Sequence, residues 1–317
     1  MKKTDFAFDG FRRALRLAFL CTFLFASVFA LFSCASVAGA NAKVNAFDTL
    51  DSDALVYLSL PVGAHTELAD SLVKNMLGSD ISDKYVKNIT DSLERVYVGI
   101  GSASDRNRLQ VACDGTVSAA SKLALSSSDY FSKKIQNVNT AGVYPVFTEK
   151  KSGVQICNPG SGVILISHDI VPQLKKYDSE ANAQIASGVL ALDNANELEW
   201  KESEAYKFVG DSKTNNVRLY MNKPLSFITN LLGTTLSSSI FQLNYIEGDF
   251  EKLPSGKYSV DLNMEFSRDN LIVKAVTFLK VALLMTDSKV IQSDVRHLTV
   301  SGVQVSLSQM QNMLGLR

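Results

Sequence analysis

The clearest pattern along the chain is an alternation of apolar and polar side chains with a period of two residues. It runs from Lys257 to Phe266, where residues of one parity are all apolar and those of the other parity are all polar. Such a strand has one buried and one solvated face, which is typical of antiparallel sheets. A second alternating stretch, Phe241–Tyr245, precedes a turn region at Gly248–Gly256, so the two strands are predicted to form a hairpin.

A similar hairpin is predicted in the first half of the chain. Val96–Ile100 and Leu109–Cys113 alternate in the same way, and the polar stretch Ser102–Asn107 separates them. Helical periodicity precedes this hairpin at Thr66–Leu77 and at Ser82–Leu93. Strands with one apolar face and amphipathic helices together predict an α+β fold in which an antiparallel sheet is covered by helices.

The two predicted hairpins lie about 149 residues apart in the sequence. At the same offset the pentapeptide SGVQI at 152–156 recurs as SGVQV at 301–305. We infer a divergent internal duplication, with one α+β repeat at 54–165, a connecting segment at 166–214 and a second repeat at 215–317. Independent convergence on similar strand chemistry is the alternative.

The connecting segment carries weaker signals. We expect a helix near Val171–Tyr177 and strands near Val189–Leu192 and Leu198–Phe208. The pair His168-Asp169, just before that helix, is the only adjacent pair that a catalytic mechanism would use. Capping of the helix by Asp169 accounts for the pair more simply.

The N-terminus is typical of an export signal. Basic residues within residues 1–16 precede Leu17–Phe32, in which 14 of 16 residues are apolar. This run is shorter than the ~20 residues that span a bilayer and has the length of a signal-peptide core. It ends at Leu31-Phe32-Ser33-Cys34, which resembles the lipobox of bacterial lipoproteins. The resemblance implies a signal peptide at residues 1–33 and lipidation of Cys34, which would become the new N-terminus.

Two alternatives remain for the N-terminus. Phe32 departs from the usual small residue, although looser spirochaete-type lipoboxes tolerate it. Cleavage after Ala38-Gly39-Ala40 would release a soluble protein, and retention of the uncharged stretch Leu17–Ala40 would leave an uncleaved anchor. All three interpretations export the chain, and the lipid-anchored one places it in the bacterial cell envelope, with the outer membrane favoured. The polar residues that follow predict a flexible tether at 34–53.

The segment Leu271–Met285 is the most unusual stretch of the exported part. Twelve of its 15 residues are apolar, and the three polar ones fall within one 120° arc of a helix. One interpretation is a helix buried on both flanks, with its lysines reaching water. The other is a helix that lies in a bilayer interface. The candidate membrane contacts are Leu271, Lys274, Phe278, Leu279, Lys280 and Leu283.

The lipobox residues Leu31–Cys34, an α+β body and strongly amphipathic helices together resemble treponemal outer-membrane lipoproteins. Members of that group are thought to insert helices into the inner leaflet of the membrane. The resemblance is architectural, so it implies a membrane-associated role and transfers no functional residue except Cys34.

Two cysteines remain in the exported part besides Cys34. Cys113 has the parity of the apolar side chains of its strand, whereas Cys157 has the parity of its polar neighbour Gln155. Opposite parities argue against pairing, and a turn at Asn158–Gly160 would allow it. A disulfide, which an exported protein can form, and two separate thiols therefore both stay open.

Charge and composition narrow the function. Lys and Arg balance Asp and Glu at 32 each, and without residues 1–34 the net charge is −3, so nothing indicates nucleic-acid binding. The three histidines have no metal-ligand spacing, and no nucleophile elbow or phosphate loop is present. We expect no enzyme activity, cofactor or metal.

The expected partners are membrane lipid, through the acyl chains, and an unknown envelope protein. Two functions fit. The first is membrane engagement through Leu271–Met285. The second is a tethered module that binds a protein partner or an apolar ligand.

Overall fold

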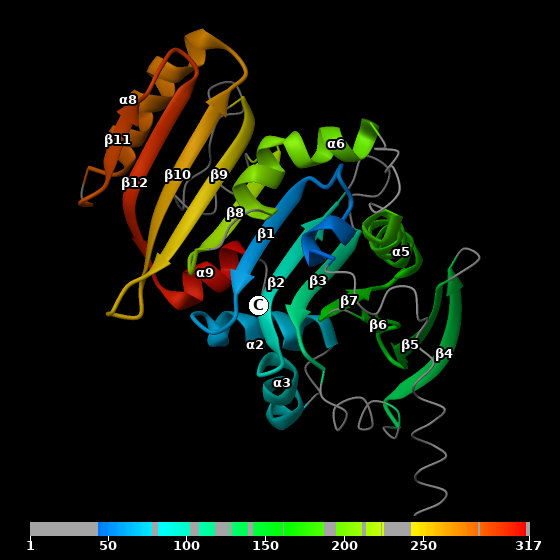
Figure 1. Ribbon diagram of the computed structural model, residues 1–317. Helices are drawn as coiled ribbons and strands as arrows, with labels where there is room; N and C mark the ends of the chain where they lie inside the picture. Colours follow the sequence, from blue (N-terminus) through cyan, green and yellow to red (C-terminus); the bar gives the residue numbers. More distant parts are fainter. Residues whose placement is uncertain are drawn as a thin grey trace, which may run out of the picture.

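The computed structural model describes residues 44–77, 82–101, 108–117, 126, 129–138, 142–160, 162–186, 195–210, 214–222, 224, 242–284 and 286–314. Within these residues twelve strands form one sheet in the order β11-β12-β10-β9-β8-β1-β2-β3-β7-β6-β5-β4 (Figure 1). Every neighbouring pair is antiparallel. The strands are β1 (Val56–Pro61), β2 (Leu93–Ile100), β3 (Leu109–Gly115), β4 (Phe131–Val138), β5 (Gly142–Glu149), β6 (Gln155–Gly160), β7 (Val163–Ser167), β8 (Val217–Asn222), β9 (Leu243–Lys252), β10 (Tyr258–Phe266), β11 (Lys289–Gln292) and β12 (His297–Val305).

Helical segments accompany this sheet, so the fold is α+β with an antiparallel sheet, as the sequence predicted. The α-helices are α2 (Thr66–Leu77), α3 (Asp83–Thr90), α5 (Val171–Ala186), α6 (Ala195–Glu202), α8 (Ile272–Ala282) and α9 (Leu307–Met313). Short turns of other helix types are η1 (Ala46–Thr49), η2 (Tyr206–Gly210) and η3 (Asp269–Leu271).

Alternation along the strands divides the core into two hydrophobic clusters, one on each face of the sheet. In β2, Val96 and Val98 belong to the first cluster, whereas Tyr97 belongs to the second. Side chains of α2, α3, α8 and α9 join the first cluster, and side chains of η1, α5, α6 and η2 join the second. The central strands are therefore apolar on both faces, which explains why their sequences read as nearly continuous apolar runs.

Strand β10 contributes its apolar side chains to the first cluster and its other face is polar, as the two-residue alternation predicted. The alternation expected at Phe241–Tyr245 is wrong for β9, because a bulge opposite Glu265 and Phe266 places Leu243 in the first cluster and turns Tyr245 toward the second.

The turn between β9 and β10 is shorter than expected, because β9 continues through Gly248 to Lys252. A Cβ atom at Gly248 would lie 2.8 Å from the Phe250 ring. This glycine therefore accommodates a close side chain within a strand rather than a turn.

The helices of the first half differ in how well they were predicted. Helix α2 has the expected bounds, Thr66–Leu77. Helix α3 ends at Thr90, and Leu93, expected in the helix, begins β2. The strand expected near Leu198–Phe208 is wrong, because helix α6 and the π-helical turn η2 occupy this region. The strand expected at 189–192 lies outside the described residues.

Residues 44–53, which were expected to belong to a flexible tether, are instead packed against the fold from Val44 onward. The ring of Phe47 lies 5.3–5.7 Å, centroid to centroid, from four aromatic rings of the second cluster. Asp51 forms ion pairs with Arg108 at 3.0 Å and Lys176 at 3.3 Å. The buried Phe47 ring and the ion-paired Asp51 carboxylate thus hold residues 44–53 against the fold. From their polar composition these residues were expected to be solvated.

The disulfide that the sequence left open is not formed. Cys113 is buried in the first hydrophobic cluster and Cys157 in the second, so the two side chains lie on opposite faces of the sheet. The physical reason is that successive side chains of a strand point to opposite faces of the sheet, and each cysteine lies at the position of its strand that faces away from the other.

The predicted duplication finds a parallel in the strand order. Reading outward from the central pair, β8-β9-β10-β12-β11 on one side corresponds to β1-β2-β3-β7-β6 on the other. The repeated pentapeptide does not occupy equivalent places, because 152–156 leads into β6 whereas 301–305 lies in β12. Gly153 and Gly302 both have positive φ, 74° and 77°. Both places therefore favour glycine, which accounts for part of the similarity between the two pentapeptides. The duplication stays a prediction.

Candidate functional site: an apolar pocket and helix α8

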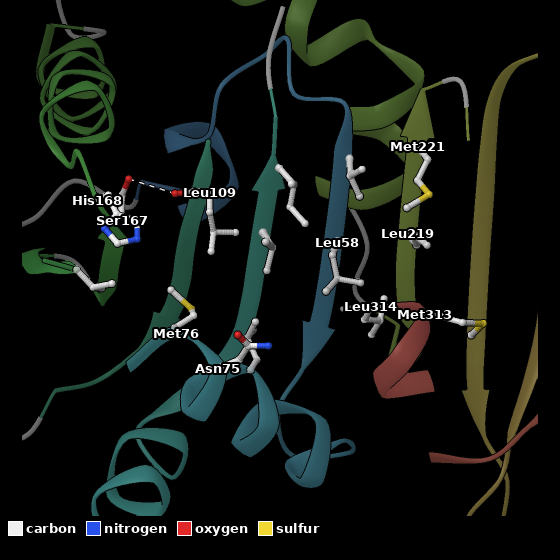
Figure 2. Close-up of a pocket in the computed structure, with 15 residues that line it drawn as sticks. Leu58, Asn75, Met76, Leu109, Ser167, His168, Leu219, Met221, Met313 and Leu314 are labelled. Atoms are coloured by element: carbon white, nitrogen blue, oxygen red, sulfur yellow. Dashed lines mark hydrogen bonds between the residues drawn. The ribbon is translucent and has the colours of Figure 1, made fainter. Parts of the chain in front are cut away.

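An apolar pocket of about 620 Å³ opens on the first face of the sheet (Figure 2). Strands β1, β2, β3 and β8 supply its floor, because alternate side chains of these neighbouring strands point to the same face. The floor residues are Val56, Leu58, Val98, Ile100, Leu109, Leu219 and Met221. The volume lies within the range of about 300–1,000 Å³ that is usual for small-molecule sites.

Helices α2 and α9 form the walls of this pocket. Helix α2 contributes Leu72, Asn75 and Met76, and Met313 and Leu314 come from the end of α9. The amide of Gln311 on α9 donates a hydrogen bond of 2.8 Å to Ser71 Oγ on α2, which ties the two walls together. The wall methionines are flexible and polarisable, so they can adapt to ligands of irregular shape.

One end of the pocket is polar. Ser167 and His168 lie at the end of β7, and Figure 2 shows them on the side of the pocket away from Met221 and Met313. Ser167 Oγ donates to the backbone, since it lies 3.2 Å from Leu109 O and 3.1 Å from Asp169 O. His168 is exposed.

Asp169, the second residue of the pair His168-Asp169, caps the following helix as the sequence predicted. The carboxylate of Asp169 accepts a hydrogen bond of 3.3 Å from the backbone N–H of Val171, the first residue of α5. Asp169 therefore serves the helix terminus.

A buried histidine holds the start of α2 in place. His65 Nε2 lies 2.7 Å from Asn215 O, so this nitrogen must donate, because a carbonyl oxygen only accepts. Nδ1 then accepts from the Tyr258 hydroxyl at 3.3 Å, and the two rings stack. Burial lowers the pKa of His65, so the neutral form is the one that fits. The sequence offered only the position of His65 ahead of a helix.

Helix α8 carries the candidate membrane contacts, and the structure divides them. Leu271, Leu279 and Leu283 are buried in the first hydrophobic cluster. Lys274 and Lys280 are exposed, and Phe278 is partly buried. Three apolar side chains that were not among the candidates are the most exposed, at 64% for Val273, 69% for Val281 and 75% for Leu284.

Other site types find little support in the described part of the chain. No group of three or more His, Cys, Asp or Glu side chains there could hold a metal ion. No helix in the same part is long and apolar enough to cross a membrane. The predicted signal peptide and the predicted lipidation site Cys34 lie outside the described residues.

Comparison with known proteins defines the class first: this is an exported lipoprotein of the bacterial envelope. A family model described as outer membrane-associated lipoprotein TP0453 matches residues 41–311, so the chain belongs to this family. The match confirms the resemblance to treponemal lipoproteins and the lipid-anchored envelope location, with the outer membrane favoured. The family description indicates no catalytic function.

Solved structures of TP0453 share the fold. Crystal form I is 15% identical over 87% of this chain and 98% of that chain, with a TM-score of 0.61. Crystal form III is also 15% identical, over 86% of this chain and 98% of that chain, with a TM-score of 0.59. No curated protein matches the sequence.

The pocket was missed from the sequence. Its floor residues come from four strands far apart in the chain and look like ordinary core positions in each of them. What distinguishes them is that, among the described residues, the helices beside them leave a space above these strands, and this depends on tertiary packing.

Proposed function

We propose that this lipoprotein is a non-catalytic, membrane-tethered module that binds an apolar ligand in the pocket on the sheet face. The observation that carries the proposal is the pocket of about 620 Å³ with almost entirely apolar side chains. The apolar side chains that line a space of this size lack partner atoms on the side that faces it, so a ligand that fills it would supply those dispersion contacts.

The chemistry of the lining supports a lipid-like ligand. Twelve of the 15 lining residues are apolar. Such a surface gives little direction to a polar ligand but stabilises an alkyl chain by about 25 cal/mol for each Å² removed from water. An envelope lipoprotein lies beside a plentiful source of such chains.

Two variants that fill the pocket test this proposal. Met76→Trp and Met221→Trp place an indole into it from α2 and from β8. Ile291→Trp is the matched control, because Ile291 is half exposed on the edge strand β11, away from the pocket. The protein is the chain 35–317 without acyl groups, which contains every described residue.

Binding of the uncharged dye Nile red is the readout, with urea unfolding to confirm that each variant is folded. We expect both pocket variants to weaken dye binding at least about tenfold, because keeping roughly 60 Å² of the dye's apolar surface out of the pocket costs about 1.5 kcal/mol. The control should bind as the parent does. Unchanged binding in both folded pocket variants would refute the proposal.

A second candidate function is contact with the membrane through α8. It is favoured by one observation, the exposed apolar flank of Val273, Val281 and Leu284 beside the exposed Lys274 and Lys280. Apolar side chains flanked by lysines are typical of helices that lie at a bilayer surface. Flotation of the chain 35–317 with anionic liposomes tests it. If the chain does not float, the flank is a candidate contact for an envelope protein.

A further inference from the structure

The pocket is polar at one end only. Ser167 and His168 lie where β7 ends, whereas Leu219, Met221, Met313 and Leu314 surround the opposite end (Figure 2). The third polar lining residue, Asn75, is on the α2 wall between them.

The polar end has one group ready for a ligand. Ser167 is buried, and its hydroxyl already bonds to backbone carbonyl oxygens. The imidazole of His168 is exposed and makes no hydrogen bond to another described residue. A neutral imidazole carries one N–H donor and one acceptor nitrogen, so it can serve a polar head group at the mouth of the pocket.

The distance between the two ends fits a long alkyl chain. From β7 to β8 the pocket crosses β3, β2 and β1, which is four strand spacings. At about 4.8 Å each these spacings span roughly 19 Å. Every floor side chain along this path is apolar, so a polar group placed there would lose its water without gaining a partner.

We propose that the pocket binds a long-chain amphiphile in one orientation, with an acidic head group (carboxylate or phosphate) at His168 and the alkyl chain running across the sheet to Met221 and Met313. This rests on the proposed function, namely that the pocket binds apolar ligands. His168 donates a hydrogen bond to the head group and thereby discriminates an acid from the corresponding alkane.

The first test compares palmitic acid, hexadecanol and hexadecane as competitors of Nile red. His168→Ala should weaken palmitic acid about tenfold, as expected for one hydrogen bond to a charged group, and leave hexadecane unchanged. His168→Gln, which keeps an N–H donor, should recover part of the loss. His297→Ala is the matched control, since His297 lies on β12 outside the pocket.

The second test measures the orientation directly. Stearic acid with a nitroxide near the carboxylate should broaden the NMR signals of the His168 ring, and stearic acid with the nitroxide near the methyl end should broaden the methyl signals of Met221 and Met313. The reverse pattern, or equal broadening at both ends, would overturn the orientation. Lysophosphatidic acid in place of palmitic acid distinguishes a phosphate from a carboxylate head group.

The outcomes separate the two proposals. If Met76→Trp and Met221→Trp leave Nile red binding unchanged, the proposed ligand-binding function fails. If they weaken dye binding but none of the three competitors displaces the dye, the pocket binds apolar ligands and the inference of a long-chain amphiphile fails. If hexadecane competes as well as palmitic acid and His168→Ala changes neither, the pocket binds apolar ligands without reading a head group, and only the inference about His168 fails.

Discussion

The two sides of α8 give opposite predictions for neighbouring residues. Leu279 is 2% exposed and belongs to the first hydrophobic cluster, whereas Val281, two residues on, is 69% exposed. Truncation of Leu279 should therefore affect folding, and a charge at Val281 should affect membrane binding.

The magnitudes follow from burial. Leu279→Ala removes a fully buried side chain and leaves a cavity, which costs about 2–5 kcal/mol. A loss of about 3 kcal/mol would lower the urea midpoint by roughly 1 M for an m-value near the upper end of the usual range. Val281→Asp replaces an exposed side chain and should change the free energy of unfolding by no more than about 0.5 kcal/mol.

Membrane binding should show the reverse. If Val281 enters the interface, removal of its burial costs about 1.5 kcal/mol or more, which reduces partitioning onto anionic liposomes at least about tenfold. Flotation of the chain 35–317 measures this, with urea unfolding of the same samples. Leu279→Ala should float as the parent does below its unfolding transition.

Three results would refute this reasoning in different ways. Unchanged stability of Leu279→Ala would show that α8 is not part of the core. Unchanged flotation of a folded Val281→Asp would remove the membrane contact. Weaker flotation of folded Leu279→Ala than of Val281→Asp would mean that α8 leaves the fold to insert, because the buried side would then be the one that meets lipid.

Further predictions concern stability and thiol chemistry. The pKa of His65 is lowered in the folded state, so the unfolded chain binds the extra proton first and the free energy of unfolding falls as the pH drops below about 6.5. Between pH 7.5 and 5.5 this loss is at most about 1.4 kcal/mol, and it should vanish in His65→Gln when urea unfolding is compared at both pH values. Phe47→Ala should cost about 3–5 kcal/mol in the same assay, because its ring is fully buried among four others, and a loss below 1 kcal/mol would contradict the packing of residues 44–53. Cys113 and Cys157 should resist a maleimide in the folded protein, because both thiols are buried and burial raises the pKa of Cys113. After unfolding without reductant both should react. A protein that stays unlabelled and has a mass lower by two hydrogens, as for a disulfide, would contradict this.

The sequence predicted strand β10 well and the strands of the connecting segment poorly. In β10 one face is buried and the other is wet, so alternation alone identifies the strand. Around Trp200 the pattern of apolar residues resembles a strand, yet the chain is helical there. The Trp200 ring packs beside Phe47, which lies 5.4 Å away and more than 150 residues earlier in the chain. A contact of that separation leaves no trace in a local window of sequence.

The same reasoning separates the two parts of the candidate site. Helix α8 was found because its apolar arc is wider than one sheet face requires, but the sequence could not say which apolar residues face outward. That depends on where β12 and β11 lie beneath the helix, and the exposed set proved to be Val273, Val281 and Leu284. The pocket depends on how α2 and α9 pack beside the described strands, which no periodicity of the sequence records.

Anchoring changes how strong these interactions need to be. If Cys34 carries acyl chains, as the sequence predicts, nine residues separate it from Val44, where the packed fold begins. The ten Cα–Cα steps from Cys34 to Val44 reach at most about 33–36 Å, so Val44 would stay within that distance of the bilayer. Confinement of this kind raises the effective concentration of lipid at α8 and at the pocket to the millimolar range or above, as for any short linker. A membrane or ligand affinity too weak to matter for a soluble protein would then suffice. The acyl chains would then assist both the contact of α8 with the membrane and the binding of ligand in the pocket. Removal of the acyl chains should weaken both interactions without altering the fold.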